Sequence, residues 1–404
     1  MTAFAAVMTG KGTAAISTIQ VFGDSTETII KKIFKPAGLK PAEFKPGKIL
    51  LGAIIDPARQ EAIDQVTIGC EGPESIAIHC HGNPLIVEMI MQLLQRNGAT
   101  LLTAEELLAK ILTAQRSIST ITVEAKLAQL KAQTLQGTKI VVNQIEGGLS
   151  KKATQWLQNI DAISLKEIIS GAEQIIQDSE IAKLIIYGCT IAIAGPPNTG
   201  KSTLLNCLAG RQKAIISEIK GTTRDWVSAR CQIEPLSIEL IDTAGLDENL
   251  ASAPKNTIEK AAQKKTVEIL NRADLILLVL DNSQPENSID SRLLKKIADK
   301  KIVTVLNKSD LPARFDAGKL PGILSNTVSI SAKFGDGIEN LTRKILQICG
   351  VADFDIHTII CFTPRQENLL RQLQKAKSKK QVTVLITELL NGKIKNCHCE
   401  ETCR

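Results

Sequence analysis

Apolar and polar residues alternate in short runs along the first eighty residues of the chain. Such alternation predicts strands, because successive side chains of a strand point to opposite faces of a sheet. The expected strands are 3–8, 14–22, 48–55, 63–69 and 75–80. Apolar residues at helical spacing then predict a helix over Pro84–Arg96, which Asn97-Gly98 would end.

Two helical patterns follow, from Glu105 to about Lys183 and from Arg365 to Leu390. Within the first, Ser164 and Glu167 have the spacing of a capping box, which predicts the start of a helix. Between the two patterns, hydrophobic strand-like runs alternate with helices, at 189–195, 236–241, 275–281, 301–306 and 327–331. This alternation predicts a mostly parallel sheet with helices on both faces.

The fold class expected from these patterns is α/β plus all-α. A small N-terminal α/β domain precedes a helical domain, and a second α/β domain is inserted into that helical domain. The four expected segments are 1–115, 116–186, 187–350 and 351–404.

Composition narrows the class of protein. With 404 residues, 44% of them hydrophobic and 23% charged, the chain is neither disordered nor collagen-like. The longest apolar run, Leu184–Gly195, has 12 residues, short of the ~18–20 that cross a bilayer. The N-terminus has no basic residue before its apolar stretch, so we expect no secretory signal and a cytoplasmic protein. The ten cysteines are then expected to be thiols.

Positive charge is concentrated near the C-terminus. The net charge is +7, and residues 365–404 contain nine Lys or Arg against four Glu, a local excess of +5. Two interpretations stand: a solvated helix face followed by a basic tail, or a contact to a phosphate backbone. With only eight Phe, two Trp and one Tyr in the chain, extensive stacking on nucleic-acid bases is not expected.

The strongest chemical motif is G-x-x-x-x-G-K-S at 195–202, which follows an expected strand and opens a helix. In such a loop, backbone N–H groups hold phosphates, the lysine reaches the β- and γ-phosphate oxygens, and the serine hydroxyl ligates Mg²⁺. The residues assigned here to GTP or GDP binding are Asn198, Thr199, Gly200, Lys201, Ser202 and Thr203.

A guanine-reading motif follows about 105 residues later. The Asp310 carboxylate can accept hydrogen bonds from the ring N–H and the amine of guanine, which adenine does not offer at those positions. Ser331-Ala332-Lys333 would supply a backbone N–H to the base oxygen. The predicted base-reading residues are Asn307, Lys308, Asp310, Ser331, Ala332 and Lys333. Together with the phosphate loop they predict a GTP-binding domain.

Two further loops are expected to sense the γ-phosphate. Asp242 would hold Mg²⁺ through water, the Gly245 N–H would bind the γ-phosphate, and Thr223 would complete the Mg²⁺ shell. Loss of the γ-phosphate would release both loops. The other residues assigned to these loops are Ser217, Glu218, Ile219, Lys220, Gly221, Thr222, Thr243 and Ala244.

These segments resemble one known family, the potassium-activated MnmE (TrmE) GTPases of tRNA wobble-uridine modification. The resemblance is specific in PPNTGKSTLLN, SEIKGTTRDW, DTAGL and LILLVLD, and looser in the N-terminal FAAVMTGKGTAAISTIQVFG. It covers most of the chain and matches the order of an inserted domain.

The resemblance implies a catalytic cation. Family members use K⁺ in place of an arginine finger, and the ligands here would be Asn198 with Ser217, Ile219 and Thr222. The family's water-orienting glutamate falls on Glu259. The alternative for Glu259 is a surface helix residue paired with a neighbouring lysine.

The resemblance also implies partners and a further cofactor: a homodimer, an FAD-binding MnmG-like protein, and tRNA contacted through the basic C-terminal segment. Family members bind a one-carbon tetrahydrofolate. Here Gln20 stands where the family has Arg, Ala77 where it has an acid, and the C-terminal Cys-x-Gly-Lys is absent. Binding of folate is therefore expected to be much weakened.

Three readings of the function follow. The first is a K⁺-dependent GTPase that modifies tRNA with its partner. The second is a divergent GTPase switch or ribosome-assembly factor that has lost the folate chemistry, and the third is a scaffold that binds nucleotide without hydrolysing it. For the terminal Cys397, Cys399 and Cys403 with His398, three roles stand: a zinc site, a substitute for the family's terminal thiol, or an unstructured tail.

Overall fold

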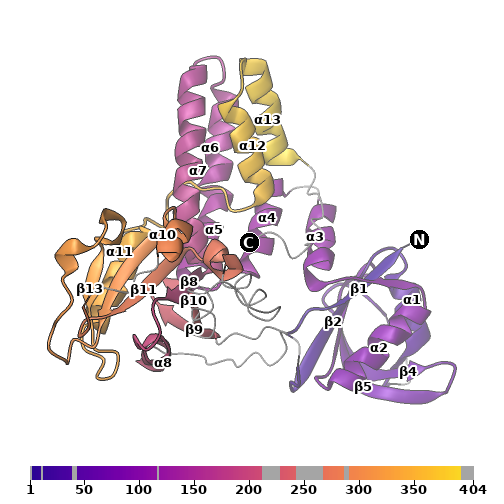
Figure 1. The fold of residues 1–404 in the computed structure, drawn as a ribbon. Coiled ribbons are helices and arrows are strands. Elements are labelled where there is room, and N and C mark those ends of the chain that lie inside the picture. The colour runs from indigo at the N-terminus through magenta and orange to yellow at the C-terminus, as the bar shows by residue number, and fades with distance from the viewer. Residues whose placement is uncertain are drawn as a thin grey trace. The chain divides into compact units, whose positions relative to one another are not determined.

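The computed structural model describes residues 2–10, 12–38, 43–115, 118–211, 228–242, 267–285 and 291–392. The chain divides into two units, Met1–Ser119 and Thr120–Arg404 (Figure 1). The finer division into four segments remains a prediction.

The first unit is built on a seven-stranded sheet in the order β3-β4-β5-β6-β2-β1-β7. All neighbouring strands are antiparallel except β1 and β7. The strands are β1 (Ala3–Val7), β2 (Ile16–Phe22), β3 (Phe34–Pro36), β4 (Ile49–Asp56), β5 (Glu61–Gly72), β6 (Ser75–His81) and β7 (Ala99–Leu101).

Three helices accompany this sheet: α1 (Thr26–Ile33), α2 (Pro84–Arg96) and α3 (Ala104–Ala114). α1 and α2 pack their apolar sides on the same face, where every second residue of β2 and β6 is buried in one core. α2 begins where predicted, because the Asn83 side chain accepts a hydrogen bond from the Leu85 N–H and proline follows the cap. α3 contacts β1 and places the Lys110 ammonium 4.4 Å from the centre of the Phe4 ring.

The second unit contains a six-stranded sheet in the order β13-β12-β11-β8-β10-β9, parallel except for β9. Its strands are β8 (Cys189–Ala194), β9 (Ser228–Ile233), β10 (Leu236–Asp242), β11 (Leu275–Asp281), β12 (Lys301–Asn307) and β13 (Thr327–Ser329). The accompanying helices are α8 (Lys201–Arg211), α10 (Ser291–Ile297), α11 (Ile338–Cys349) and the short 3-10 helices Ala317–Lys319 and Gly322–Leu324. The central strands β8, β11 and β12 are mostly apolar because both faces of the sheet are covered.

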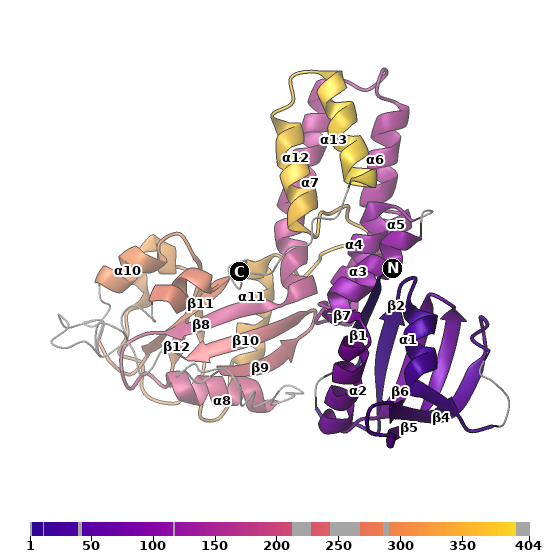
Figure 2. The ribbon, with the colours of Figure 1, turned by 90° about the vertical axis from the view of Figure 1, so that its right-hand side faces the viewer.

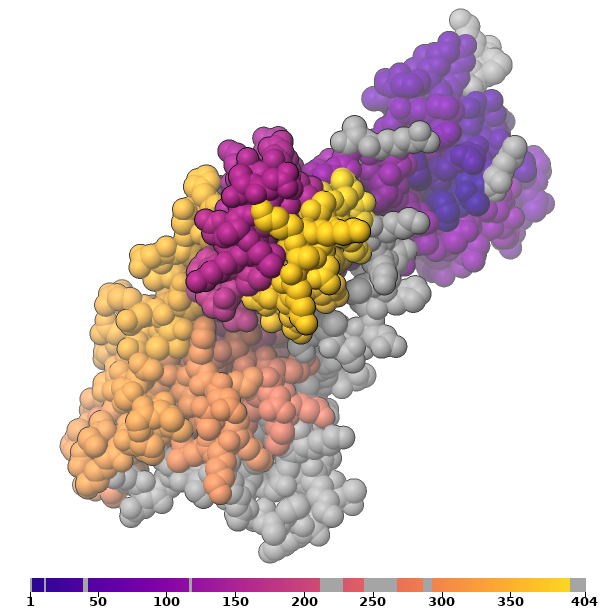
Figure 3. Space-filling view, turned by 90° about the horizontal axis from the view of Figure 1, so that it is seen from above, coloured from indigo at the N-terminus to yellow at the C-terminus, as the bar shows by residue number. Residues whose placement is uncertain are grey.

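A helical bundle completes this unit. α4 (Thr120–Gln129), α5 (Leu135–Glu146), α6 (Leu149–Gln158) and α7 (Leu165–Tyr187) precede the six-stranded sheet, whereas α12 (Pro364–Gln374) and α13 (Lys379–Asn391) follow it. α12 packs on α7 and α13 on α6, so chain segments about 200 residues apart lie side by side (Figures 2 and 3). This confirms the predicted insertion of an α/β domain into a helical one. The predicted capping box of Ser164 and Glu167 is present at the start of α7.

Buried polar groups join the two halves of the bundle. The Gln144 amide donates to the Thr358 carbonyl (3.0 Å) and accepts from the N–H of Ile360 (3.1 Å). The Tyr187 hydroxyl donates to the Phe362 carbonyl (2.6 Å). Within the described ranges, no helix has both the length and the apolar composition needed to cross a membrane.

Candidate nucleotide site

The phosphate loop joins the end of β8 to the start of α8. Its two glycines have positive φ angles, 140° at Gly195 and 91° at Gly200. A side chain at Gly195 would collide with the Val279 carbonyl of β11, and one at Gly200 with the Asn307 amide. Glycine is therefore required at both positions by the backbone angle and by the close approach of neighbouring segments.

Lys201 is held inside this loop. Its side chain is buried, and its ammonium donates to the carbonyls of Gly195 (2.7 Å) and Pro196 (2.9 Å). The Thr199 hydroxyl donates to the same Pro196 carbonyl (3.0 Å) and fixes the turn. The loop thus presents a cation together with the N–H groups at the start of α8, an arrangement suited to phosphate.

Ser202 and Asp242 come together beside the loop. The Ser202 hydroxyl, in the first turn of α8, donates to a carboxylate oxygen of Asp242 at the end of β10 (2.6 Å). Hydroxyl and carboxylate oxygens are the ligands that Mg²⁺ prefers, bound directly or through water. These two residues fit a Mg²⁺ ion, and the third predicted ligand, Thr223, lies outside the described residues.

Asn307 ties three predicted segments to one another. Its buried amide donates to the Thr199 carbonyl of the phosphate loop (2.8 Å) and accepts from the Ala332 N–H (2.9 Å). The Ser331 hydroxyl donates to the Asp310 carboxylate (2.6 Å), which orients that exposed group. The segments predicted to bind phosphate and to read the base therefore form one site.

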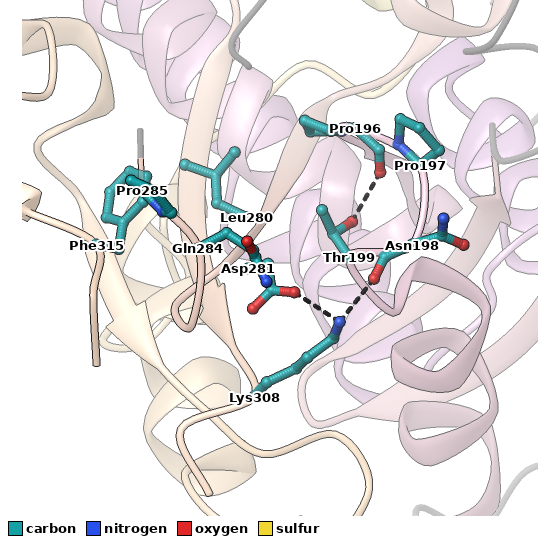
Figure 4. A pocket seen from close by; sticks show the side chains of 10 residues that line it. All are labelled: Pro196, Pro197, Asn198, Thr199, Leu280, Asp281, Gln284, Pro285, Lys308 and Phe315. Carbon is teal, nitrogen blue, oxygen red and sulfur yellow. Dashed lines mark hydrogen bonds and ion pairs between the residues drawn. The ribbon is translucent and has the colours of Figure 1, made fainter. Parts of the chain in front are cut away.

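Lys308 contacts an acid that sequence reasoning did not assign. Its ammonium donates to the Asn198 carbonyl (2.8 Å) and to the Asp281 carboxylate (2.6 Å), as Figure 4 shows. Asp281 also accepts from the N–H (2.9 Å) and hydroxyl (2.6 Å) of Ser283. Partial burial alone would raise the pKa of Asp281, but the hydrogen bonds from Lys308 and Ser283 outweigh it and lower that pKa.

A sequence signal for Asp281 existed. It ends an apolar strand, as Asp242 does, and in the register of β11 and β12 it pairs with Asn307. Parallel strands bring their carboxyl ends to one edge of the sheet, so an acid at this position lies next to the guanine-reading loop.

A cavity of about 260 Å³ lies between the phosphate loop and the end of β11. It is lined by Pro196, Pro197, Asn198, Thr199, Leu280, Asp281, Gln284, Pro285, Lys308 and Phe315 (Figure 4). The Asn198 carbonyl faces Lys308, whereas its side-chain amide points away. Asn198 and Lys308 both have positive φ angles (62° and 66°), a strained conformation for residues other than glycine.

Of the remaining predicted residues, two are exposed side chains, and the others lie outside the described residues. Thr203 is exposed on α8, and the exposed Lys333 holds its ammonium 5.1 Å from the centre of the Phe334 ring. Residues outside the described ranges are Ser217, Glu218, Ile219, Lys220, Gly221, Thr222, Thr223, Thr243, Ala244, Gly245 and Glu259, as well as the tail with Cys397, His398, Cys399 and Cys403. Elsewhere in the described chain, no three His, Cys, Asp or Glu residues group as a metal site.

In the first unit, the two positions where the family has charged folate-binding groups are uncharged. Gln20 is buried, and its amide donates to the Ser75 hydroxyl (3.0 Å), which in turn donates to Glu71 (2.8 Å). Ala77 is the direct cross-strand partner of Gln20 between β2 and β6. The two positions are thus neighbours that carry no charge, and they do not fit a ligand held by an arginine and an acid.

Comparison with known proteins agrees with this geometry. The family model described as "GTP-binding protein TrmE N-terminus" matches residues 3–107, and "50S ribosome-binding GTPase" matches residues 190–308. The tRNA modification GTPase MnmE of Lactiplantibacillus plantarum is 30% identical over 379 residues, covering 85% of this chain and 80% of the relative. This chain belongs to the MnmE (TrmE) family.

Other MnmE proteins give the same result. The MnmE of Moorella thermoacetica is 30% identical over 380 residues, covering 85% of this chain and 81% of that protein. Among solved structures, the G domain of the T. maritima FeoB iron transporter is 28% identical and covers 40% of this chain and 98% of that one. Its TM-score of 0.32 is too low to carry an argument. As an MnmE-family GTPase, the chain is a GTP-hydrolysing enzyme.

Proposed function

We propose that this MnmE-family GTPase hydrolyses GTP with Mg²⁺ and K⁺ to drive modification of the wobble uridine of tRNA. An FAD-binding MnmG-like partner would share the reaction, which installs a carboxymethylaminomethyl-type group. One observation carries the proposal: Asn307 joins the phosphate loop to the guanine-reading loop in a chain whose relatives are named tRNA modification GTPases.

The described residues suggest how GTP would be bound. Lys201 and the N–H groups at the start of α8 would hold the phosphates, and Ser202 and Asp242 would hold Mg²⁺, whose charge offsets that of the β- and γ-phosphates. Asp310, oriented by Ser331, would accept the guanine N–H groups. Asn198 would contribute its outward-pointing amide to a K⁺ site with Ser217, Ile219 and Thr222, and Glu259 would orient the attacking water.

A homodimer and a cytoplasmic location belong to the same proposal. Support for a dimer comes from large apolar side chains exposed on the first unit: Ile16, Ile49, Leu51, Leu85 and Met89. Association of two copies through this unit could remove these side chains from water. Binding of tRNA through the basic C-terminal segment is the remaining part of the proposal.

A second candidate is a GTPase switch or ribosome-assembly factor without modification chemistry. The observation that favours it is the uncharged pair Gln20 and Ala77, because a one-carbon tetrahydrofolate would find neither a cation nor an acid there. Both candidates share the nucleotide site and differ only in what GTP hydrolysis drives.

Nucleoside analysis of tRNA separates the two candidates. Deleting the gene in its own host should remove the modified wobble uridine, and the wild-type chain should restore it. A Lys201→Ala chain should fail to restore it, since the phosphates lose their buried cation. Unchanged wobble nucleosides in the deletion strain would contradict the modification function and leave the switch.

A further inference from the structure

Four lysines lie within six residues at the junction of α12 and α13, from the end of one helix to the first turn of the next, a segment we call the lysine loop (375–380). Lys375, Lys377 and Lys380 are exposed, and the ammonium of the half-buried Lys379 donates to the Asp161 carbonyl (2.8 Å). This bond joins the lysine loop to the turn between α6 and α7, and both turns lie at the same end of the bundle (Figures 1 and 2). Figure 3 looks down on this end.

The structure separates these lysines from the other basic residues of the C-terminal segment. Arg365 donates to both carboxylate oxygens of the buried Glu124 (2.7 and 2.8 Å), and Arg371 pairs with Glu367 (2.7 Å). For the lysine loop, by contrast, the described residues place no carboxylate within ion-pair distance of any ammonium. The two arginines therefore stabilise the bundle, whereas Lys375, Lys377 and Lys380 face solvent.

The position of these charges is unfavourable for the fold itself. Lys379 and Lys380 occupy the first turn of α13, which contains no acidic residue. The start of a helix carries partial positive charge, so cations there are destabilising by a few tenths of a kcal/mol each. Ser378 caps the helix by accepting from the Gln381 N–H (3.3 Å), so the lysines are not needed to begin it. A negatively charged ligand bound at this point would instead be attracted both by the lysines and by the start of α13.

We propose that the lysine loop binds the phosphate backbone of RNA, with the helix start of α13 contributing to the positive field. The identity of that RNA as tRNA rests on the proposed function. Lysine ammonium groups are flexible point charges that suit phosphates and carry no sequence readout. An anionic membrane fits less well, because the apolar residues of and around the loop, Leu373, Ala376 and Val382, are buried and cannot insert into lipid.

The test is the salt dependence of tRNA binding by the full-length chain. Fluorescence anisotropy with labelled tRNA is recorded from 50 to 200 mM KCl for wild type and for K375Q/K377Q/K379Q/K380Q. Each lost phosphate contact lowers the slope of log affinity against log salt by about 0.7–0.9, so we expect a slope smaller by about 3. Over this range, wild type should lose roughly 60-fold more affinity than the variant.

The matched control is K32Q/K35Q/K295Q/K296Q, which removes four exposed lysines from other elements and should keep the wild-type slope. The thermal unfolding temperature of the lysine-loop variant should be unchanged or slightly raised, because the substitutions remove positive charge from the start of α13. An unchanged slope in that variant would overturn the inference and leave the proposed function standing. Lack of tRNA binding by wild type would overturn both. If the lysine-loop variant lost binding to phosphatidylserine vesicles but kept its binding to tRNA, the ligand of the loop would be a membrane and not RNA.

Discussion

Asp281 illustrates what one carboxylate does at the nucleotide site. It neutralises Lys308, and Lys308 in turn donates to the Asn198 carbonyl, so this one ammonium joins the base-reading loop to both the end of β11 and the phosphate loop. The side chain of Asp281 is mostly buried, which strengthens this interaction relative to a surface pair. Lys308 and Asn198 keep their strained backbone angles within this network.

Replacing Asp281 by Asn should weaken nucleotide binding. The amide keeps the shape of the carboxylate but removes its charge, so Lys308 loses its partner and is less well positioned. A loss of about 1.4 kcal/mol, or about tenfold in GDP affinity, is expected from a charged hydrogen bond. Fluorescent GDP titration measures it, and Ser283→Ala, which keeps the carboxylate, should have a smaller effect. Equal GDP affinity in wild type and Asp281→Asn would show that the ion pair does not position Lys308.

Sequence reasoning found the residues of the site that belong to fixed motifs and missed those that depend on register. Lys201, Ser202 and Asn307 could be located because their spacing reflects the chemistry of phosphate and guanine. Asp281 ends an apolar strand, which is a signal in the sequence, but its role depends on which residue of β12 lies opposite it. Gln20 and Ala77 were located through the family resemblance, but that they are direct neighbours is seen only once β2 and β6 pair.

At the level of elements, the apolar runs predicted the positions of most strands, but they did not predict an interrupted edge strand or the break between two helices. Five of the six strands in the second unit lie where their apolar runs predicted. β9 was not predicted, since Arg230 and Gln232 interrupt its apolar residues and it pairs at the sheet edge. The break between α4 and α5 has no Gly or Pro; it is fixed by Thr134, whose hydroxyl caps α5 and donates to the Ile185 carbonyl (2.8 Å).

The pair of Lys183 and Glu367 links α7 to α12 and gives the bundle a pH dependence. Lys183, with a smaller contribution from Arg371, lowers the pKa of Glu367 against the opposing effect of partial burial. A lowered acid pKa stabilises the fold fully above the ordinary value of about 4.3, and this stabilisation is lost as the pH falls through the lowered value.

Denaturant unfolding of wild type and Glu367→Gln at several pH values tests this link. Wild type should be more stable by about 1 kcal/mol at pH 7, and the difference should shrink below about pH 4. Arg371→Gln removes only the more exposed partner and should cost less. A difference that stays constant from pH 7 to pH 3 would contradict the assigned role of Glu367.

For the whole molecule, the order of the segments was enough to predict how the chain is assembled. Two helical stretches flank one α/β stretch, and they can bury their apolar faces together only if the α/β part is inserted between them. The lysine loop and the nucleotide site belong to the same unit but to different parts of it, the bundle and the sheet. In the proposed function, hydrolysis at one would act on RNA held at the other.

In the proposed function, this chain is a GTPase whose catalytic cation is K⁺. Steady-state GTP hydrolysis by the full chain, in KCl and in NaCl at equal ionic strength, tests it most directly, with tetrahydrofolate binding followed on the same sample. We expect turnover faster in K⁺ by about tenfold or more, loss of that difference in Asn198→Ala, and weak or no folate binding. Equal turnover of wild type in K⁺ and Na⁺ would contradict the claim.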